Sequence, residues 1–101
     1  MSVTSDLSRD GEELTITIIG RFDFAAHQDF RSAYEGAQGI PRRFVVDLKG
    51  TSYLDSSALG MLLLLRDHAG GENSKISLIN CNKDADTILT ISNFSKLFTI
   101  G

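Results

Sequence analysis

The sequence has too little of several residue types for some classes of protein. Its single cysteine, Cys81, cannot form an internal disulfide, which agrees with a reducing compartment. The 10 Lys and Arg residues are outnumbered by 13 Asp and Glu residues, so a surface that binds nucleic-acid phosphates is not expected. The longest apolar block, residues 59–65, is far shorter than the roughly 20 residues of a membrane-spanning helix. The N-terminal residues also lack the basic start and apolar centre of a secretion signal, so we expect a cytoplasmic protein with no nucleic-acid or membrane partner.

Motifs of catalysis and cofactor binding are missing as well. No G-x-S-x-G nucleophile motif occurs, and neither glycine-rich loop that holds nucleotides, G-x-x-x-x-G-K-[ST] or G-x-G-x-x-G, is present. His27 and His68 are not spaced as a metal-binding pair, and Cys81 has no partner in a CxxC motif. We therefore expect a protein that is not an enzyme and holds neither a cofactor nor a metal.

What the sequence does contain is the composition of an ordinary globular protein. Hydrophobic residues make up 42% of the 101 residues and charged residues 23%, and no repeat or linker divides the chain. We expect one domain over residues 1–101.

Two kinds of periodicity alternate along this chain. Leu14, Ile16 and Ile18 alternate with threonines, as in a strand. A helical stripe follows, formed by Ala26, Phe30, Ala33, Tyr34 and Ala37. The first half of the chain is thus predicted to contain a hairpin of residues 2–8 and 13–20, a helix from Ala25 that ends before Gly39 and Pro41, and a strand of residues 43–48 buried on both faces. The second half is predicted to contain a helix of residues 56–69 that ends before Gly70 and Gly71, a strand of residues 75–80, a helix capped by Asn82 or Asp84, and a terminal strand of residues 96–100.

This order, ββαβαβαβ, predicts an α/β fold. Strands that alternate with helices are joined by crossover connections, which make a sheet mainly parallel. We expect a mixed sheet of about five strands, with the N-terminal hairpin at its edge and three helices.

The stretch "TSYLDSS", residues 51–57, is predicted to be a loop that leads from the inner strand directly into the helix that begins at about Ser56. Loops at the carboxyl ends of parallel strands are frequent sites of function. Asp55 or Ser56 can simply be the N-cap of the helix, which contributes on the order of 1 kcal/mol. Alternatively, one hydroxyl accepts a phosphoryl group, because the helix N-terminus tolerates the negative charge.

The helix after this loop has more leucines than its core side needs. Leu63 and Leu64 point well away from the core if the core direction is set by Ala58, Met61, Leu62, Leu65 and Ala69. Either a neighbouring part of the chain covers these two leucines or a protein partner does.

The motif "VVDLKGTSYLDSSALG", together with "GRFDF" at residues 20–24 and the strand "ISLIN", resembles the STAS-domain anti-sigma-factor antagonists, also called anti-anti-sigma factors. The resemblance covers nearly the whole chain. It implies that Ser56 matches the serine that a cognate anti-sigma factor with kinase activity phosphorylates. Asp55, Ser57 and Asp23 match residues around that serine.

The resemblance also implies a mechanism of partner switching in bacterial transcription. The unphosphorylated form binds the anti-sigma factor and frees the sigma factor, phosphorylation ends this binding, and a metal-dependent serine phosphatase restores it. We expect the docking face to lie on the outward side of the helix of residues 56–69, formed by Leu59, Gly60, Leu63, Leu64 and Asp67.

Two departures from the family pattern are visible. Ala58 stands where relatives usually have glycine, and the family's helix after the last strand is missing from the predicted elements, which makes a monomer or a weak homodimer possible. One alternative is a STAS subunit of a larger assembly, such as a lipid-transport ATPase or a stress-sensing complex, in which Ser56 is only a cap. Another is a phospho-aspartate receiver domain built on Asp47, although the paired acids after the first strand are missing.

Overall fold

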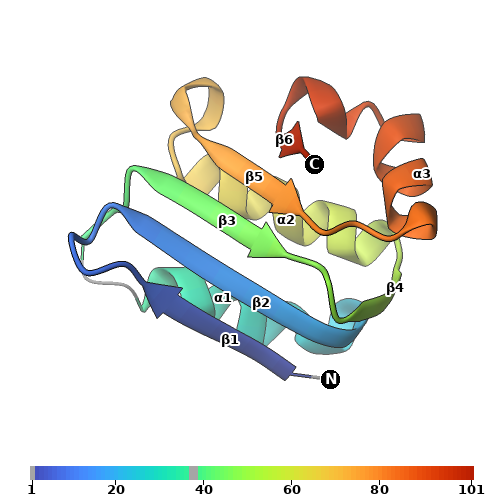
Figure 1. The fold of residues 1–101 in the computed structure, drawn as a ribbon, viewed down its shortest axis with the longest axis horizontal. Coiled ribbons are helices and arrows are strands. Elements are labelled where there is room, and N and C mark those ends of the chain that lie inside the picture. The colour runs from blue at the N-terminus through green and yellow to red at the C-terminus, as the bar shows by residue number, and fades with distance from the viewer. Residues whose placement is uncertain (1, 37–38) are drawn as a thin grey trace.

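A mixed sheet with helices on one face organises the protein (Figure 1). The structure is a computed structural model that describes residues 2–36 and 39–101. In this part of the chain the sheet has six strands in the order β1-β2-β3-β5-β6, with β4 paired to β2. The elements are β1 (Ser2–Leu7), β2 (Glu13–Phe22), α1 (His27–Glu35), β3 (Arg43–Asp47), β4 (Thr51–Leu54), α2 (Ser56–His68), β5 (Ile76–Ile79), α3 (Lys83–Ile91) and β6 (Thr99–Ile100).

The predicted hairpin and the mainly parallel sheet are confirmed. Strands β1 and β2 pair antiparallel, whereas β2, β3, β5 and β6 pair parallel in turn and β4 runs parallel to β2. The hairpin turn contains Gly11 at a φ of 73°, a conformation that suits glycine. The Ser8 hydroxyl donates a hydrogen bond of 2.7 Å to the Asp10 carboxylate in the same turn.

The core lies between one face of the sheet and helices α1 and α2. In Figure 1 both helices lie behind the sheet, and no helix covers the near face. Leu14, Ile16 and Ile18 of β2 are buried on the helix side, while Thr15 and Thr17 are only half-buried. The core is therefore made by one side of each strand, as the alternation of apolar and polar residues in β2 indicates.

The prediction that residues 43–48 are buried on both faces is wrong. The strand is central, since β3 lies between β2 and β5. However, only Phe44 and Val46 within β3 are buried, and Val45 and Asp47 are half-buried on the other face. A short apolar run cannot by itself tell a strand between two helical layers from one with a single layer.

The prediction that residues 51–57 form a loop is wrong for Thr51–Leu54, which forms strand β4. Strand β2 pairs with β3 as far as Thr17 and with β4 from Gly20, and the register shifts between Gly20 and Arg21. The buried Thr51 hydroxyl donates a hydrogen bond of 2.8 Å to the Ile18 carbonyl where the two pairings meet. Strand β4 therefore pairs with the end of β2 that extends beyond its pairing with β3.

The helices follow the predicted pattern with local differences. A 3₁₀ helix, Phe24–Ala26, replaces the expected first turn of α1, and Ala37 lies outside the described residues. Helix α2 ends at His68, and Gly70 and Gly71 have positive φ angles, as expected for a glycine stop. The terminal strand is shorter than predicted, because Phe94–Lys96 forms a 3₁₀ helix and only Thr99–Ile100 pairs with β5.

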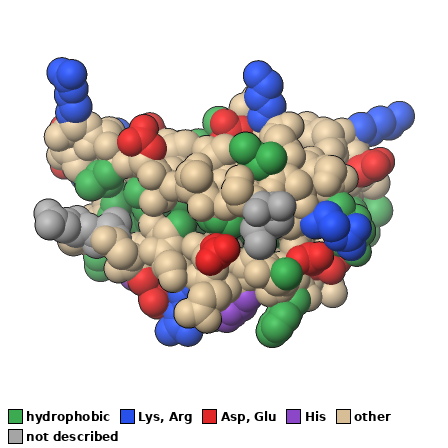
Figure 2. All heavy atoms as spheres, turned by 90° about the horizontal axis from the view of Figure 1, so that it is seen from below, with side chains coloured by type: hydrophobic (Ala, Val, Ile, Leu, Met, Phe, Trp, Pro, Cys, Tyr) green, Lys and Arg blue, Asp and Glu red, His purple; other side chains and the backbone are tan. Residues whose placement is uncertain are grey.

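The charged side chains on the surface are mixed. Figure 2 shows the face seen from below, on which acidic and basic side chains alternate around scattered hydrophobic ones. None of the helices in the described ranges combines the length and the hydropathy needed to cross a membrane.

Leu64 and Leu65, two neighbouring leucines of α2, allow a test of whether only one side of this helix faces the core. Leu65 is 0% exposed, whereas Leu64 is 48% exposed. We expect Leu65→Ala to lower the free energy of unfolding by about 2–5 kcal/mol, because it leaves a cavity. Leu64→Ala should lower it by less than about 1 kcal/mol. Urea unfolding followed by circular dichroism measures both, and equal losses would contradict the orientation of α2.

Candidate functional site

The candidate site lies where strands β2 and β4 end side by side. Phe22 of β2 pairs with Leu54 of β4, so the next residues, Asp23 and Asp55, follow two neighbouring strand ends. Both have extended backbones, with φ and ψ of −130° and −169° at Asp23 and −133° and −169° at Asp55. Each aspartate begins a helix, which places two carboxylates at the same end of the sheet.

Asp55 is the N-cap of α2. Its Oδ1 accepts hydrogen bonds from the backbone N–H groups of Ser57, at 3.0 Å, and Ala58, at 3.2 Å. These bonds satisfy two of the N–H groups that a helix start leaves unpaired. The choice that the sequence left open between Asp55 and Ser56 as the cap is thereby decided in favour of Asp55.

The two serines after the cap differ in their surroundings. Ser56 is the first residue of α2 and is exposed, whereas Ser57 is half-buried. Within residues 2–36 and 39–101, no hydrogen bond of either hydroxyl is found. The Ser56 hydroxyl is thus accessible, and the helix start does not depend on it.

Asp23 has a role like that of Asp55 on the neighbouring strand. Its Oδ1 accepts a hydrogen bond of 3.0 Å from the Ala25 backbone N–H, and its Oδ2 lies 3.2 Å from Nε of Arg21. Asp23 therefore holds the loop after β2 in place. The family resemblance had implied only that Asp23 lies near Ser56.

Sequence reasoning missed two contacts beside this site. The Arg21 guanidinium lies over the Tyr53 ring, 4.1 Å from its centroid, in a cation–π contact between paired strands. Phe24, which is 74% exposed, stacks on His27 at a centroid distance of 5.7 Å. No alternation in the sequence marks Tyr53 as an outward aromatic, because Ser52 and Tyr53 of β4 are both exposed.

The outward side of α2 continues from Ser56 along the helix. We call the exposed residues Ser56, Gly60, Leu63, Leu64 and Asp67 the outer side of α2. Leu63 and Leu64 are exposed, as the sequence predicted, so no neighbouring part of the described chain covers them fully. Leu59, which was predicted on the docking face, is half-buried and packs against the core. A Cβ added to Gly60 would meet nothing within 4 Å, so its place is open.

The other ionisable side chains do not form a metal centre. Among the described residues there is no group of three His, Cys, Asp or Glu side chains that could hold a metal ion. Asp47, the residue of the receiver-domain alternative, accepts hydrogen bonds of 3.0 Å from the Lys49 backbone N–H and the Asn80 side chain. Burial, followed by the charge of Asp86, raises the pKa of the Cys81 thiol, which disfavours the reactive thiolate.

Comparison with known proteins gives one consistent result. The family model described as "Mlab, STAS domain" matches residues 5–99. A STAS-domain-containing protein of Pseudomonas aeruginosa, strain UCBPP-PA14, is 66% identical over 101 residues, which cover 100% of both chains.

Solved structures share this fold at low sequence identity. The unphosphorylated anti-sigma factor antagonist SpoIIAA has a TM-score of 0.70 and 16% identity, over 99% of this chain and 87% of that one. The SpoIIAA of Bacillus has also been solved in a phosphorylated form, with a TM-score of 0.70 and 17% identity over 99% and 91% of the two chains. A sulfate transporter family protein of Wolinella succinogenes has a TM-score of 0.74 and 11% identity over 93% and 80%. One fold thus occurs both in an anti-sigma factor antagonist and in a sulfate transporter family protein.

The cap of α2 can be tested by substitution. Asp55→Ala removes the acceptor for the Ser57 and Ala58 N–H groups and should lower the free energy of unfolding by about 0.5–2 kcal/mol. Asp55→Asn is the matched control, because asparagine caps helices about as well. Thermal or urea unfolding gives both values. A loss in Asp55→Asn as large as in Asp55→Ala would show that the charge, and not the cap, stabilises the helix start.

Proposed function

Because this chain belongs to the STAS domain family, we propose that it is an anti-sigma-factor antagonist whose partner binding is switched by phosphorylation of Ser56. The observation that carries the proposal is the exposed Ser56 hydroxyl at the start of α2, beside a cap that Asp55 provides alone. A kinase needs a hydroxyl that it can reach and whose modification does not unfold the protein. Ser56 meets both requirements.

A phosphate on Ser56 changes the surface more than the fold. It adds about −1.5 to −2 charges at the N-terminus of α2, where unpaired N–H groups and the helix dipole favour negative charge. Asp55 and Asp23 already place two carboxylates at this end of the sheet. The added phosphate would therefore repel an acidic partner surface and obstruct close packing against the start of the helix.

The partner contacts the outer side of α2 in this proposal. Leu63 and Leu64 offer apolar area at 40% and 48% exposure, and Gly60 lets a partner's backbone approach the helix closely. Ser56 lies at one end of the same surface and Asp67 at the other. A phosphate at Ser56 thus acts at the edge of the contact area itself, without a conformational change.

The partner is an anti-sigma factor that also has serine kinase activity, and a metal-dependent serine phosphatase reverses the modification. ATP and metal belong to these partners, and the protein itself acts as a cytoplasmic binding module in bacterial transcription. The SpoIIAA structures in both phosphorylation states support this proposal as a parallel in a protein of the same fold.

A second candidate function is that of a non-switching subunit in a larger assembly. The match to a sulfate transporter family protein favours it, because the fold alone does not require a phosphorylated serine. In this case Ser56 is a solvent-exposed helix residue with no regulatory role, and the outer side of α2 is a permanent contact.

Phosphorylation of Ser56 distinguishes the two functions. Incubation with ATP and the serine kinase isolated with the protein from its native host should place phosphate on Ser56, as mapped by mass spectrometry. Ser56→Ala should abolish the modification, while Ser57→Ala, the matched control, should keep it.

Ser56→Asp should bind the partner at least about tenfold more weakly by calorimetry, with unchanged unfolding. Phosphate that persists in Ser56→Ala, or full affinity of Ser56→Asp, would contradict the proposed switch.

Gly60 tests the docking surface without any change of charge. Gly60→Ala should raise the free energy of unfolding by about 0.5–1 kcal/mol, because alanine is the better helix residue and its Cβ meets no atom. It should nevertheless weaken partner binding measured by calorimetry, because the methyl group blocks close approach. Thr90→Ala, at an exposed position of α3, is the control that raises helix propensity elsewhere. Unchanged affinity of Gly60→Ala would place the contact off this part of α2.

A further inference from the structure

Strand β1 lies at one edge of the sheet, and its outer side has no neighbouring strand in the parts of the chain that the structure describes (Figure 1). Five of its six residues are exposed, and its pairing with β2 continues without a bulge from Ser2 to Leu7. The backbone of β1 is therefore open along its whole length to a further strand.

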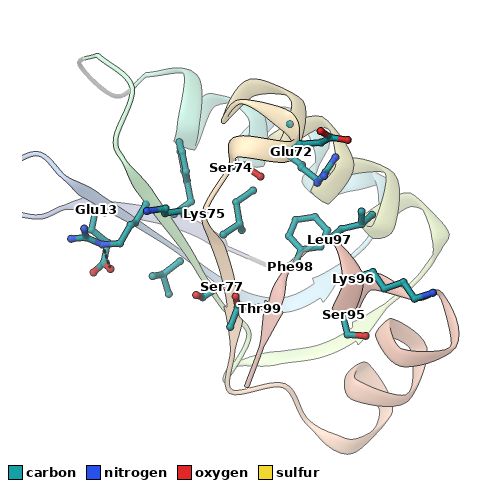
Figure 3. Close-up of a pocket in the computed structure, with 16 residues that line it drawn as sticks. Glu13, Glu72, Ser74, Lys75, Ser77, Ser95, Lys96, Leu97, Phe98 and Thr99 are labelled. Atoms are coloured by element: carbon teal, nitrogen blue, oxygen red, sulfur yellow. Dashed lines mark ion pairs between the residues drawn. The ribbon is translucent and has the colours of Figure 1, made fainter.

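The opposite edge of the sheet does not offer a comparable strand. Strand β6 has only two residues, and residues 95–98 before it border a groove of about 490 Å³ together with Ser74 and Lys75 (Figure 3). A very short edge strand is one of the ways in which proteins prevent pairing with another chain. The free edge of β1 is thus the exception in this sheet.

The residues of β1 do not protect this edge either. Lysine or proline in the strand, or a β-bulge, usually provides such protection. The sequence of β1, "SVTSDL", contains neither lysine nor proline, and Asp6 is its only charged residue. Figure 2 views the molecule from the side on which β1 lies in Figure 1, and the middle of this face has few charged side chains. Nothing in the strand itself therefore keeps a second strand away.

The backbone groups that point outward from β1 follow from the hairpin turn. The Ser8 N–H donates a hydrogen bond of 2.9 Å to the Glu13 carbonyl, so these two residues direct backbone groups toward each other. Along antiparallel strands, such pairs alternate with pairs whose backbone groups point away from each other. Leu7, Ser5 and Val3 belong to the second kind and direct their N–H and C=O groups to the free edge.

The side chains of β1 divide between the two faces of the sheet. Val3 and Leu7 each pair with a buried residue of β2, so they lie on the helix side, where Val3 packs against the core. Leu7 is still 38% exposed. Thr4 and Asp6 lie on the opposite face, which no helix covers in Figure 1. A further strand that matches β1 must therefore be apolar on one face and polar on the other.

We propose that the further strand is β1 of a second copy of this chain, paired antiparallel across a twofold axis that passes beside Ser5. Ser5 then lies opposite Ser5 of the second copy, and Val3 lies opposite Leu7. On the other face, Thr4 lies opposite Asp6. The outward backbone groups of Val3, Ser5 and Leu7 all gain partners, and the apolar pair occurs twice. The strand is also complementary to itself in charge, because Asp6 meets a hydroxyl and not another acid.

Other registers fit this strand less well. A shift by one residue would place outward backbone groups opposite inward ones and would exchange the two faces. A twofold axis beside Thr4 would place Val3 opposite Ser5 and leave Leu7 without a partner within β1. An axis beside Asp6 would bring two carboxylates together, which is unfavourable. The register centred on Ser5 is therefore the one that the sequence of β1 supports.

The association leaves the candidate site free. Strands β3 and β5 lie on the far side of β2 from β1, and helix α2 lies behind them in Figure 1. Ser56 therefore stays accessible in both copies, and the proposal does not depend on its phosphorylation.

Sedimentation equilibrium of the whole protein at about 5–500 μM tests the association. We expect a reversible dimer with a dissociation constant of about 10–100 μM, because each copy contributes one short strand. Amide hydrogen exchange at low and high protein concentration tests the place of the contact. Exchange at Val3, Ser5 and Leu7 should slow as the concentration rises, whereas exchange at Thr4 and Asp6, whose N–H groups point to β2, should change little.

Two lysine substitutions at adjacent positions test the register. Ser5→Lys places two lysines opposite each other across the twofold axis and should raise the dissociation constant at least about fivefold. Thr4→Lys, the matched control, adds the same charge opposite Asp6 of the second copy and should leave the constant unchanged or lower it. Circular dichroism checks that both variants fold.

The results separate this interface from other arrangements. A dimer whose outward amides become protected, and which only Ser5→Lys weakens, supports it. Protein that stays monomeric at about 500 μM would overturn it, in favour of an edge covered by water or by a strand of another protein. A dimer that Thr4→Lys weakens as much as Ser5→Lys does, or in which exchange slows at residues outside β1, would also overturn it.

Discussion

The hydrogen bond from the Thr51 hydroxyl to the Ile18 carbonyl joins β4 to β2 at the point where the pairing partner of β2 changes from β3 to β4. At this break β2 changes partner, so its backbone polar groups lack the regular pairing of a sheet. Thr51 is 4% exposed, and a buried acceptor left without a donor would cost about 1–3 kcal/mol. The bond keeps β4 beside β2, which fixes Leu54 opposite Phe22 and the start of α2 opposite Asp23. The geometry of the candidate site therefore depends on a contact within the sheet.

The single helical layer explains why α2 can have an accessible outer side. Ala58, Met61, Leu62 and Leu65 fill the core against one face of the sheet, and no further layer packs against the opposite side of the helix in Figure 1. A glycine in the interior of an exposed helix is unfavourable by about 1 kcal/mol relative to alanine, and no contact among residues 2–36 and 39–101 requires Gly60. An outside contact is the simplest reason for a residue that the fold does not need.

Local patterns in the sequence were sufficient for the helices, the hairpin and the place of Ser56, because caps, glycine stops and apolar periodicity act over a few residues. Strand β4 was missed because "TSYL" is short and half polar, and its pairing with β2 joins residues about 30 positions apart. The Arg21–Tyr53 contact was missed for the same reason, since its two members come from separate segments. The burial of β3 on one face depended on how many helical layers the whole chain makes, which a short apolar run does not reveal.

Under the proposed function, Asp55 caps helix α2 and Ser56 is the phosphorylation site, two roles that one residue could not have together. A serine that capped α2 would use its oxygen for the backbone N–H groups, and its phosphorylation would disturb the helix start. Here Asp55 supplies both hydrogen bonds, so the neighbouring hydroxyl is free and can change its charge while the cap stays intact. Under the proposed function, the protein can therefore switch between partners in the folded state, because the energy of the switch comes from surface electrostatics and not from the stability of the helix.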